Sequence, residues 1–280
     1  MLKRIIATAV VLLLSAVSAD AQYFGRNKVQ YDRFEFAILE TAHFDIYYYA
    51  EERSAAEIAA QMAERWYDRL SRALDHTFTR RQPIILYASH AHFTQTSILP
   101  GNIPEGVGGF TDHLAGRVVL PVAAGLGETD HGLGHELVHA FQRDILRKQG
   151  RSLALLPLWF SEGMAEYLSV GLPRDPDPTA VDSQRARLDA NTRMWLRDAS
   201  ASQKVPTLAQ LRDPKWFPYR YGQAVWAFLA ERYGADVVKR ALGARIARDA
   251  IARLEQATGQ SERDLTAGWR DYVTSVSGDT

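Results

Sequence analysis

The chain has 280 residues, 46% of them hydrophobic, which is enough to bury a large core in one large domain or two modest ones. Its 33 basic and 33 acidic residues cancel, so the charge gives no support to a nucleic-acid or membrane-surface partner. Cysteine is absent, which excludes disulfides, thiolate zinc sites and cysteine nucleophiles and leaves histidine and carboxylates as the strong metal ligands.

The first 21 residues have the pattern of a secretory signal peptide. A basic pair at positions 3 and 4 precedes an apolar run over residues 5–17, and Ala19-Asp20-Ala21 fits the small-x-small cleavage rule. The run is short for a membrane span, and no later stretch approaches twenty apolar residues. We therefore favour a cleaved signal peptide and not an uncleaved membrane anchor. The mature chain would begin near Gln22, work in the periplasm or outside the cell, and have no stable membrane span.

The elements that follow indicate a sheet with a helix packed on it. Residues 22–41 show no clear period and are interpreted as an extended lead-in. Residues 42–49 alternate as in a half-buried strand, and residues 83–87 form a short apolar run typical of a second strand. Between them, apolar residues at helical spacing predict a helix capped by Ser54; its stripe is Ala55, Ile58, Ala59, Met62, Trp66, Leu70 and Leu74. The order strand, helix, strand suggests a mixed sheet.

A loop and a hairpin come next. Glycines and prolines mark residues 100–109 as a loop, and residues 108–111 and 116–121 look like strand segments joined by a turn. An exposed strand here can bind an extended peptide by adding it to the sheet, and an ordinary hairpin is the equal alternative. His113 in the turn is interpreted as a solvated loop residue in preference to a metal ligand.

The stretch His135-Glu136-Leu137-Val138-His139 lies on a helix predicted from about Thr129 to Lys148, where Gly150 ends it. Residues four apart lie on one helix face, so both imidazoles point to one place with Glu136 beside them. This is the H-E-x-x-H pattern, in which two histidines bind zinc and the glutamate acts as general base. A buried helix that happens to carry two histidines is the alternative.

Three residues just before the motif, Gly132, Gly134 and His131, also bear on the site. Gly132 and Gly134 weaken the first turns of the helix, which is natural where a backbone passes close to another group. His131 lies four residues before His135 and could face the same point. We rank it behind a third ligand available elsewhere in the chain.

That third ligand lies on a second helix, residues 157–167, which Pro157 opens. Glu162 stands among apolar neighbours there, and because an unpaired buried carboxylate is costly it should meet a cation. The 22 residues between His139 and Glu162 let the first helix end and the chain return antiparallel. Glu166, four residues later on the same face, is placed to hold a ligand imidazole; a solvated helix residue is the alternative.

Together, the H-E-x-x-H segment and Trp159-Phe160-Ser161-Glu162-Gly163-Met164-Ala165-Glu166-Tyr167 resemble the gluzincin metallopeptidases, in particular the bacterial peptidase MA-like family, over about residues 40–235. The resemblance implies His135, His139 and Glu162 as ligands of Zn²⁺ and Glu136 as catalytic base. It implies an α+β, zincin-like fold: a small mixed sheet with packed helices and the active-site helix, followed by a mainly helical C-terminal subdomain. The corresponding division is residues 22–150 and 151–280.

Sibling families fit less well. A metzincin needs glycine at position 142 and histidine at position 145, where this chain has Gln142 and Ile145. No G-x-M-E-N segment precedes the helix, and the cysteine ligand of a peptide deformylase is absent.

Residues 23–28 also resemble the opening of secreted bacterial proteins in which a β-propeller follows such a domain. These 280 residues contain no propeller, which leaves a propeller-type partner as an alternative to a chain that acts alone.

The remaining chain is expected to be mainly helical. A proline-rich charged loop at 171–178 is followed by a helix at 181–196, a short turn at 208–211 and a helix at 219–233 closed by glycine; Ser261 opens the last helix, which Leu265, Trp269 and Tyr272 dock. In the resembling peptidases a tyrosine hydroxyl often donates to the oxyanion. Tyr221 is the first candidate for that role and Tyr219 the second, with a core tyrosine as the alternative.

The function expected from these features is that of a secreted or periplasmic zinc metallopeptidase acting on peptides or proteins. A zinc-activated water would attack the peptide carbonyl, with Glu136 taking the proton of that water. A catalytically inactive zincin-fold domain for binding or scaffolding is the second hypothesis. Zinc-dependent hydrolysis of a non-peptide bond is the third.

Overall fold

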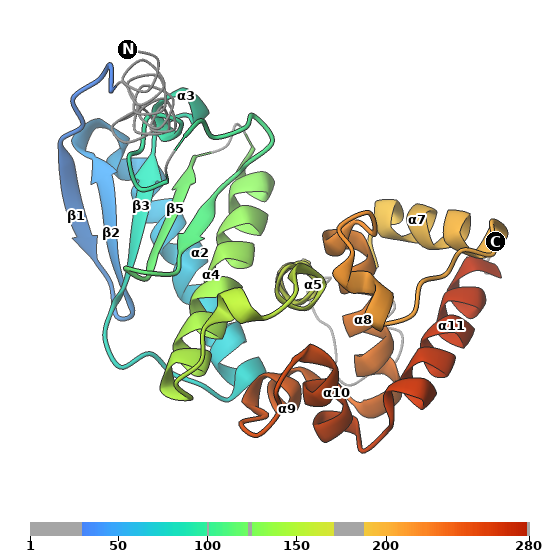
Figure 1. Ribbon diagram of the computed structural model, residues 1–280. Helices are drawn as coiled ribbons and strands as arrows, with labels where there is room; N and C mark the ends of the chain where they lie inside the picture. Colours follow the sequence, from blue (N-terminus) through green and yellow to red (C-terminus); the bar gives the residue numbers. More distant parts are fainter. Residues whose placement is uncertain (1–29, 100, 123–124, 171–187, 279–280) are drawn as a thin grey trace, which may run out of the picture.

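Figure 1 shows the computed structural model, which describes residues 30–99, 101–122, 125–170 and 188–278. The expected signal peptide and the loop at 171–178 lie outside the described residues. The strands are β1 (Phe36–Glu40), β2 (Phe44–Tyr49), β3 (Gln82–Tyr87), β4 (Phe110–Asp112) and β5 (Arg117–Pro121). The α-helices are α2 (Arg53–Leu74), α3 (His90–Phe93), α4 (Leu126–Lys148), α5 (Leu158–Ser169), α7 (Ala190–Ala201), α8 (Pro218–Tyr233), α9 (Val237–Gly243), α10 (Ala250–Thr258) and α11 (Glu262–Gly278). The short 3-10 turns are η3 (Ala50–Glu52), η4 (Leu153–Leu155) and η5 (Ala209–Arg212).

The five strands form one mixed sheet in the order β1-β2-β3-β5-β4. The pairs β2–β3 and β3–β5 are parallel, whereas β1 and β4 each pair antiparallel with their neighbour. The expected mixed α+β fold and the hairpin of β4 and β5 are therefore confirmed. The structure adds that β4 is an edge strand, with Thr111 opposite Val118 on its paired side.

Both faces of the sheet are covered. The alternating residues Phe44, Ile46, Ile84 and Leu86 lie in the main core beneath α2 and α4, which cover the same face (Figure 1). On the other face, a smaller cluster forms around Tyr87, Phe93, Ile103 and Val119, from β3, α3, the loop after it and β5. The central strand β3 is apolar on both faces because parallel strands in the middle of a sheet are buried from both sides.

The N-terminal part departs from expectation in two details. Strand β1 lies inside the stretch interpreted as a lead-in. Its residues do not alternate between apolar and polar, so its sequence does not predict a strand, and only its pairing with β2 shows it. Helix α2 begins at Arg53 directly after η3, so Ser54 lies within the helix and does not cap it. Of the predicted stripe, Ile58 is exposed at 40%, whereas Trp66, Leu70 and Leu74 are buried.

Helix α4 is longer than expected at its start and ends where predicted. It begins at Leu126, three residues before Thr129, and ends at Lys148, with Gly150 at a φ of +68°. The close backbone approach expected at the glycines occurs at Gly134, where a Cβ would lie 2.5 Å from the ring of Trp66 on α2. Gly132 has no neighbour within 4 Å. Packing against Trp66 therefore explains the glycine at position 134 but not the one at position 132.

Helix α5 lies between α4 and α8 and meets α8 backbone to backbone (Figure 1). A Cβ on Gly163 would lie 2.3 Å from the Cα of Gly222, so neither position has room for a side chain. Trp226 of α8 donates its indole N–H to the carbonyl of Phe160 at 3.0 Å, close to this crossing. The position of α5 is therefore tightly specified by the helix behind it.

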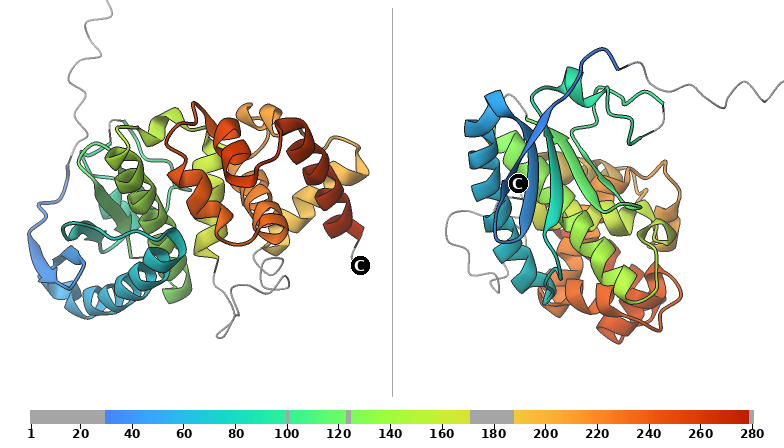
Figure 2. Two further views of the ribbon diagram at one scale, coloured as in Figure 1. Left: turned by 90° about the horizontal axis from the view of Figure 1, so that it is seen from below. Right: turned by 90° about the vertical axis from the view of Figure 1, so that its left-hand side faces the viewer.

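The C-terminal helices stack away from the sheet (Figure 2). Helix α8 agrees with the prediction of 219–233, and residues 221–230 are buried on every side of it. Helix α7 begins at Ala190, where Asp189 caps it, and ends at Ala201, five residues after the end of the helix predicted at 181–196. The first residues of that predicted helix lie outside the described chain. At the start of α11 the hydroxyl of Ser261 accepts from the Asp264 N–H as expected.

Among the described residues, no helix combines the length and hydropathy needed to cross a membrane.

The C-terminal half of α4 is anchored to the chain after α2 by Asp144, whose side chain is only 12% exposed. Its carboxylate accepts from His76 at 2.8 Å and pairs with Lys148 at 3.1 Å and Arg147 at 3.2 Å. Burial would raise the pKa of Asp144, but these three donors together lower it below its usual value. The ionised carboxylate therefore stabilises the folded chain.

We predict that Gly163→Ala lowers the free energy of unfolding by about 1–3 kcal/mol, because the new methyl group forces α5 and α8 apart. Gly132→Ala is the matched control: it adds the same methyl group to a helix where space is open and should be neutral or stabilising by up to about 1 kcal/mol. Urea unfolding of both variants measures the difference. Equal stability of the two would contradict the close crossing.

We predict that Asp144→Asn lowers the free energy of unfolding near neutral pH by about 1–3 kcal/mol. The folded pKa of this carboxyl is depressed, so its contribution is fully present above its unfolded pKa of about 3.9 and is lost as pH falls through the lower folded value. The variant should therefore lose less stability than wild type on acidification below about pH 4. Exposed Asp68→Asn serves as control. Parallel pH profiles for Asp144→Asn and wild type would overturn this account.

Candidate metal centre

Three side chains from two helices converge on one point. His135 and His139 of α4 turn their Nε2 atoms toward each other at 3.2 Å, and Oε2 of Glu162 on α5 lies 3.2 Å from the first and 3.1 Å from the second. Ligand atoms about 2.0–2.1 Å from one tetrahedral ion are roughly 3.3 Å apart, so these three atoms are spaced as one ion would require. The two residues predicted from the H-E-x-x-H pattern and the one predicted from the second helix are thus brought together.

The electrostatics of this group favour a positive charge at its centre. Burial would lower the pKa of His135, but Glu162 and Glu166 raise it to about 10. Burial would raise the pKa of Glu162, but its hydrogen bonds with His135 and His139 hold it well below the usual range. The carboxylates therefore favour a positive charge between the rings, and the two imidazoles with Glu162 fit a bound metal.

Glu166 holds the far side of the first imidazole. Its Oε1 lies 3.1 Å from Nδ1 of His135, and its Oε2 lies 3.8 Å from a guanidinium nitrogen of Arg220 on α8. Arg220 in turn pairs with Asp189, the cap of α7. A carboxylate that accepts from Nδ1 leaves Nε2 of the same ring free to face the site.

Gln142 does the same for the second imidazole, a role that the sequence motifs do not reveal. Its amide oxygen accepts from Nδ1 of His139 at 2.8 Å, and its amide N–H donates to the carbonyl of Ser161 on α5 at 3.0 Å. The side chain is completely buried. Its place three residues after His139 is the one local signal that could have pointed to it, since such residues are neighbours on a helix.

Glu136 is held by the edge strand. The hydroxyl of Thr111 on β4 donates to the carboxylate of Glu136 at 2.7 Å and lies 2.9 Å from its backbone carbonyl. A Cβ on Gly109 would lie 3.3 Å from Cγ of Glu136, so the chain just before β4 also packs closely on this side chain. Glu136 is buried, and its carboxylate is fixed between α4 and β4.

The structure places Tyr219, and not the first-ranked Tyr221, beside the histidines. Tyr221 packs against Trp195 and Trp216 and belongs to the core, whereas the ring of Tyr219 stacks on His135 at 6.1 Å between centroids. Burial raises the pKa of Tyr219, and the charges of Glu162 and Glu136 and a hydrogen bond with Glu162 raise it further. Residues two apart on a helix point in nearly opposite directions, so only one of the pair can face the site.

Two further histidines lie around this group. His113, in the turn between β4 and β5, is exposed, and its ring lies 6.2 Å from that of His139 at nearly a right angle. His131 is also exposed; its Nε2 lies 3.8 Å from Glu166 on the opposite side of His135. His131, His135 and Glu166 form a second group whose spacing could hold an ion, but it shares His135 with the first group, so the two cannot be independent sites.

A cavity of about 690 Å³ adjoins the N-terminal half of α4. Its walls are largely apolar and include Leu120, Pro121 and Val122 from the end of β5 and the residues after it. His131 and Gly132 line its other side, one helical turn before His135. The site thus has an apolar recess beside it.

Comparison of the chain with protein-family models gives no match, and comparison with curated proteins gives none. The geometry of His135, His139 and Glu162, with the residues that surround them, therefore carries the functional assignment.

Proposed function

We propose that this chain is a zinc metallopeptidase of the gluzincin type, with a zincin-like fold, which works in the periplasm or outside the cell. The observation that carries the proposal is the convergence of Nε2 of His135, Nε2 of His139 and Oε2 of Glu162 within 3.1–3.2 Å of one another. Two imidazoles and one carboxylate suit Zn²⁺, and three protein ligands are typical of a catalytic zinc with one position open.

The outer residues support a site built for a metal. Glu166 and Gln142 each accept from the Nδ1 atom of one imidazole, so both rings present the nitrogen that binds. The two supports come from different directions, since Glu166 lies on α5 and Gln142 on α4. Both supports fix the tautomer in which Nε2 of each ring faces the shared point, which is the arrangement typical of metal-binding histidines.

Bound zinc would supply Lewis acidity, lowering the pKa of water to about 7 and polarising the carbonyl of the substrate. Glu136 accepts the proton of the attacking water and passes it to the leaving amine. Thr111 donates to one oxygen of this carboxylate, which restricts its orientation. Tyr219 is the best-placed donor for the developing oxyanion, because its hydroxyl already reaches Glu162.

A peptide substrate is favoured by the sheet edge. Strand β4 lies at the edge of the sheet, and its Thr111 touches the catalytic base, so a peptide added beside β4 would run past the site. The apolar recess next to His131 offers space for a side chain of such a peptide.

We predict that Glu136→Gln retains zinc and loses peptide hydrolysis by about 10²–10⁴-fold in kcat, because the proton acceptor is removed while the ligands remain. His139→Ala should lose both zinc and activity. Exposed Glu57→Gln on α2 is the control. Zinc analysis is followed by cleavage of a mixed peptide library, which also reports the residues preferred at the cut.

The outcomes separate the hypotheses. Retained hydrolysis in pure Glu136→Gln protein refutes the role of this residue. Wild-type protein that holds zinc and leaves every peptide intact would be a binding or scaffolding domain, or a hydrolase of another bond. Wild-type protein that binds no zinc would refute the metal centre itself.

We predict that Tyr219→Phe lowers kcat by about 10²-fold and leaves KM close to the wild-type value, because its hydroxyl acts on the oxyanion and not on the bound substrate. Tyr221→Phe, two residues away in the core, is the matched control and should keep wild-type kcat. An unchanged kcat in Tyr219→Phe, or an equal loss in both variants, would contradict the assignment.

A further inference from the structure

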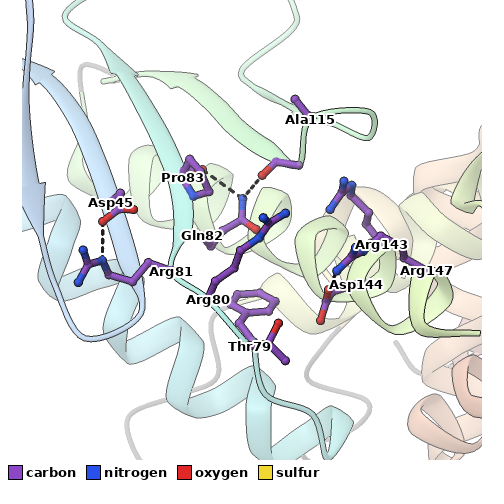
Figure 3. A pocket seen from close by; sticks show the side chains of 12 residues that line it. Asp45, Thr79, Arg80, Arg81, Gln82, Pro83, Ala115, Arg143, Asp144 and Arg147 are labelled. Carbon is purple, nitrogen blue, oxygen red and sulfur yellow. Dashed lines mark hydrogen bonds and ion pairs between the residues drawn. The ribbon is translucent and has the colours of Figure 1, made fainter.

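A second cavity, of about 600 Å³, lies on the C-terminal half of α4 and is lined by basic side chains (Figure 3). It is bounded by the chain leading into β3, by the turn before β5 and by α4. Arg80 and Arg81 come from the first of these and Arg143 and Arg147 from the last. This cavity is separate from the apolar recess beside His131, which lies on the N-terminal half of the same helix.

The charges around this cavity are not balanced. Arg81 is neutralised by Asp45 and Glu40 and turns toward Asp45 in Figure 3. The other acidic side chain, Asp144, is shared among Arg147, Lys148 and His76. Arg80 pairs with no carboxylate of the described residues. More positive than negative charge therefore faces the opening.

Arg143 is held in place without a carboxylate partner. Its Nε donates to the carbonyl of His113 at 2.7 Å and its Nη2 to that of Leu114 at 3.0 Å. Gly116 makes this possible, because a Cβ there would lie 2.5 Å from Nη1 of Arg143. These carbonyls occupy the Nε–Nη2 edge and orient the guanidinium without adding a negative charge, so the remaining N–H groups on Nη1 and Nη2 can meet an anion.

The floor of the cavity is also polar. Gln82 is buried and donates its amide N–H to the carbonyl of Gly116 at 2.6 Å, which joins the start of β3 to the turn (Figure 3). Burial lowers the pKa of Arg143 and the charges of Arg147 and Arg80 lower it further, against a smaller opposing effect of the Asp144 and Asp112 carboxylates. Guanidinium groups crowded in this way repel one another, and a bound anion would relieve that repulsion.

We propose that this cavity binds a small molecule carrying two or more phosphate or carboxylate groups, held by Arg80, Arg143 and Arg147. Its volume is within the range of about 300–1,000 Å³ found for small-molecule sites and exceeds what a single phosphate fills. Arginine forks match phosphate and carboxylate oxygens bidentately. The site is distinct from the metal centre, and its existence does not depend on the proposed function.

Isothermal titration calorimetry of the full chain tests this, with a hexose bisphosphate and a benzenetricarboxylate as probes and with inorganic phosphate and benzoate as single-anion references. We expect the multiply charged probes to bind more tightly than the references and to weaken at higher salt. Whichever probe binds more tightly identifies phosphate or carboxylate as the natural group. The same affinity is expected in His139→Ala protein, which excludes capture of the probe by a metal at the other site.

The decisive comparison uses two double variants of equal charge change. Arg80→Gln with Arg147→Gln should weaken binding of the better probe by at least about tenfold. Arg33→Gln with Arg263→Gln removes two arginines whose side chains are more than 90% exposed elsewhere on the chain and should leave affinity unchanged. Arg143 is left intact because it also holds the turn. Absence of binding to wild type, equal binding by the cavity variant, or equal loss in both variants would overturn the proposal.

Discussion

The contact between the backbones of α5 and α8 is the constraint on which the candidate metal centre depends. Gly163 and Gly222 leave no space for a side chain at the crossing, so α5 has one available position against α8. Glu162 immediately precedes that contact, and its carboxylate is thereby fixed opposite the two imidazoles of α4. The bond from Gln142 to the carbonyl of Ser161 then ties α4 to the same helix.

Several elements far apart in the chain support the same few atoms. The edge strand contributes Thr111 to the carboxylate of Glu136, α5 contributes Glu166 to His135, and α8 contributes both Arg220 and Tyr219. Buried polar groups of this kind are costly unless every partner is in place. Such a network explains why the sheet, α4 and the helical C-terminal part must be assembled together before the site exists.

Helix α4 divides into two chemically different halves. Its N-terminal half adjoins the apolar recess and its middle carries the two imidazoles, whereas its C-terminal end carries Arg143 and Arg147 beside a polar cavity. The turn between β4 and β5 lies between these regions: His113 in it approaches His139, and its carbonyls are held by Arg143. One helix thus separates the candidate metal centre from the cavity lined by arginines.

The sequence alone determined the features that follow local periodicity. The spacing of His135 and His139, the strand at 83–87, the end of α4 before Gly150 and the limits of α8 all follow from helical or strand repeats and from glycine as a terminator. Other features follow from the packing of distant segments: Tyr219 and not Tyr221 faces the site, and Gln142 and Thr111 support it. Strand β1 joins the sheet, and four arginines from two segments surround one cavity. The reason is that these contacts depend on how helices and strands cross, and a crossing is set by the packing of whole surfaces, which no single repeat along the chain encodes.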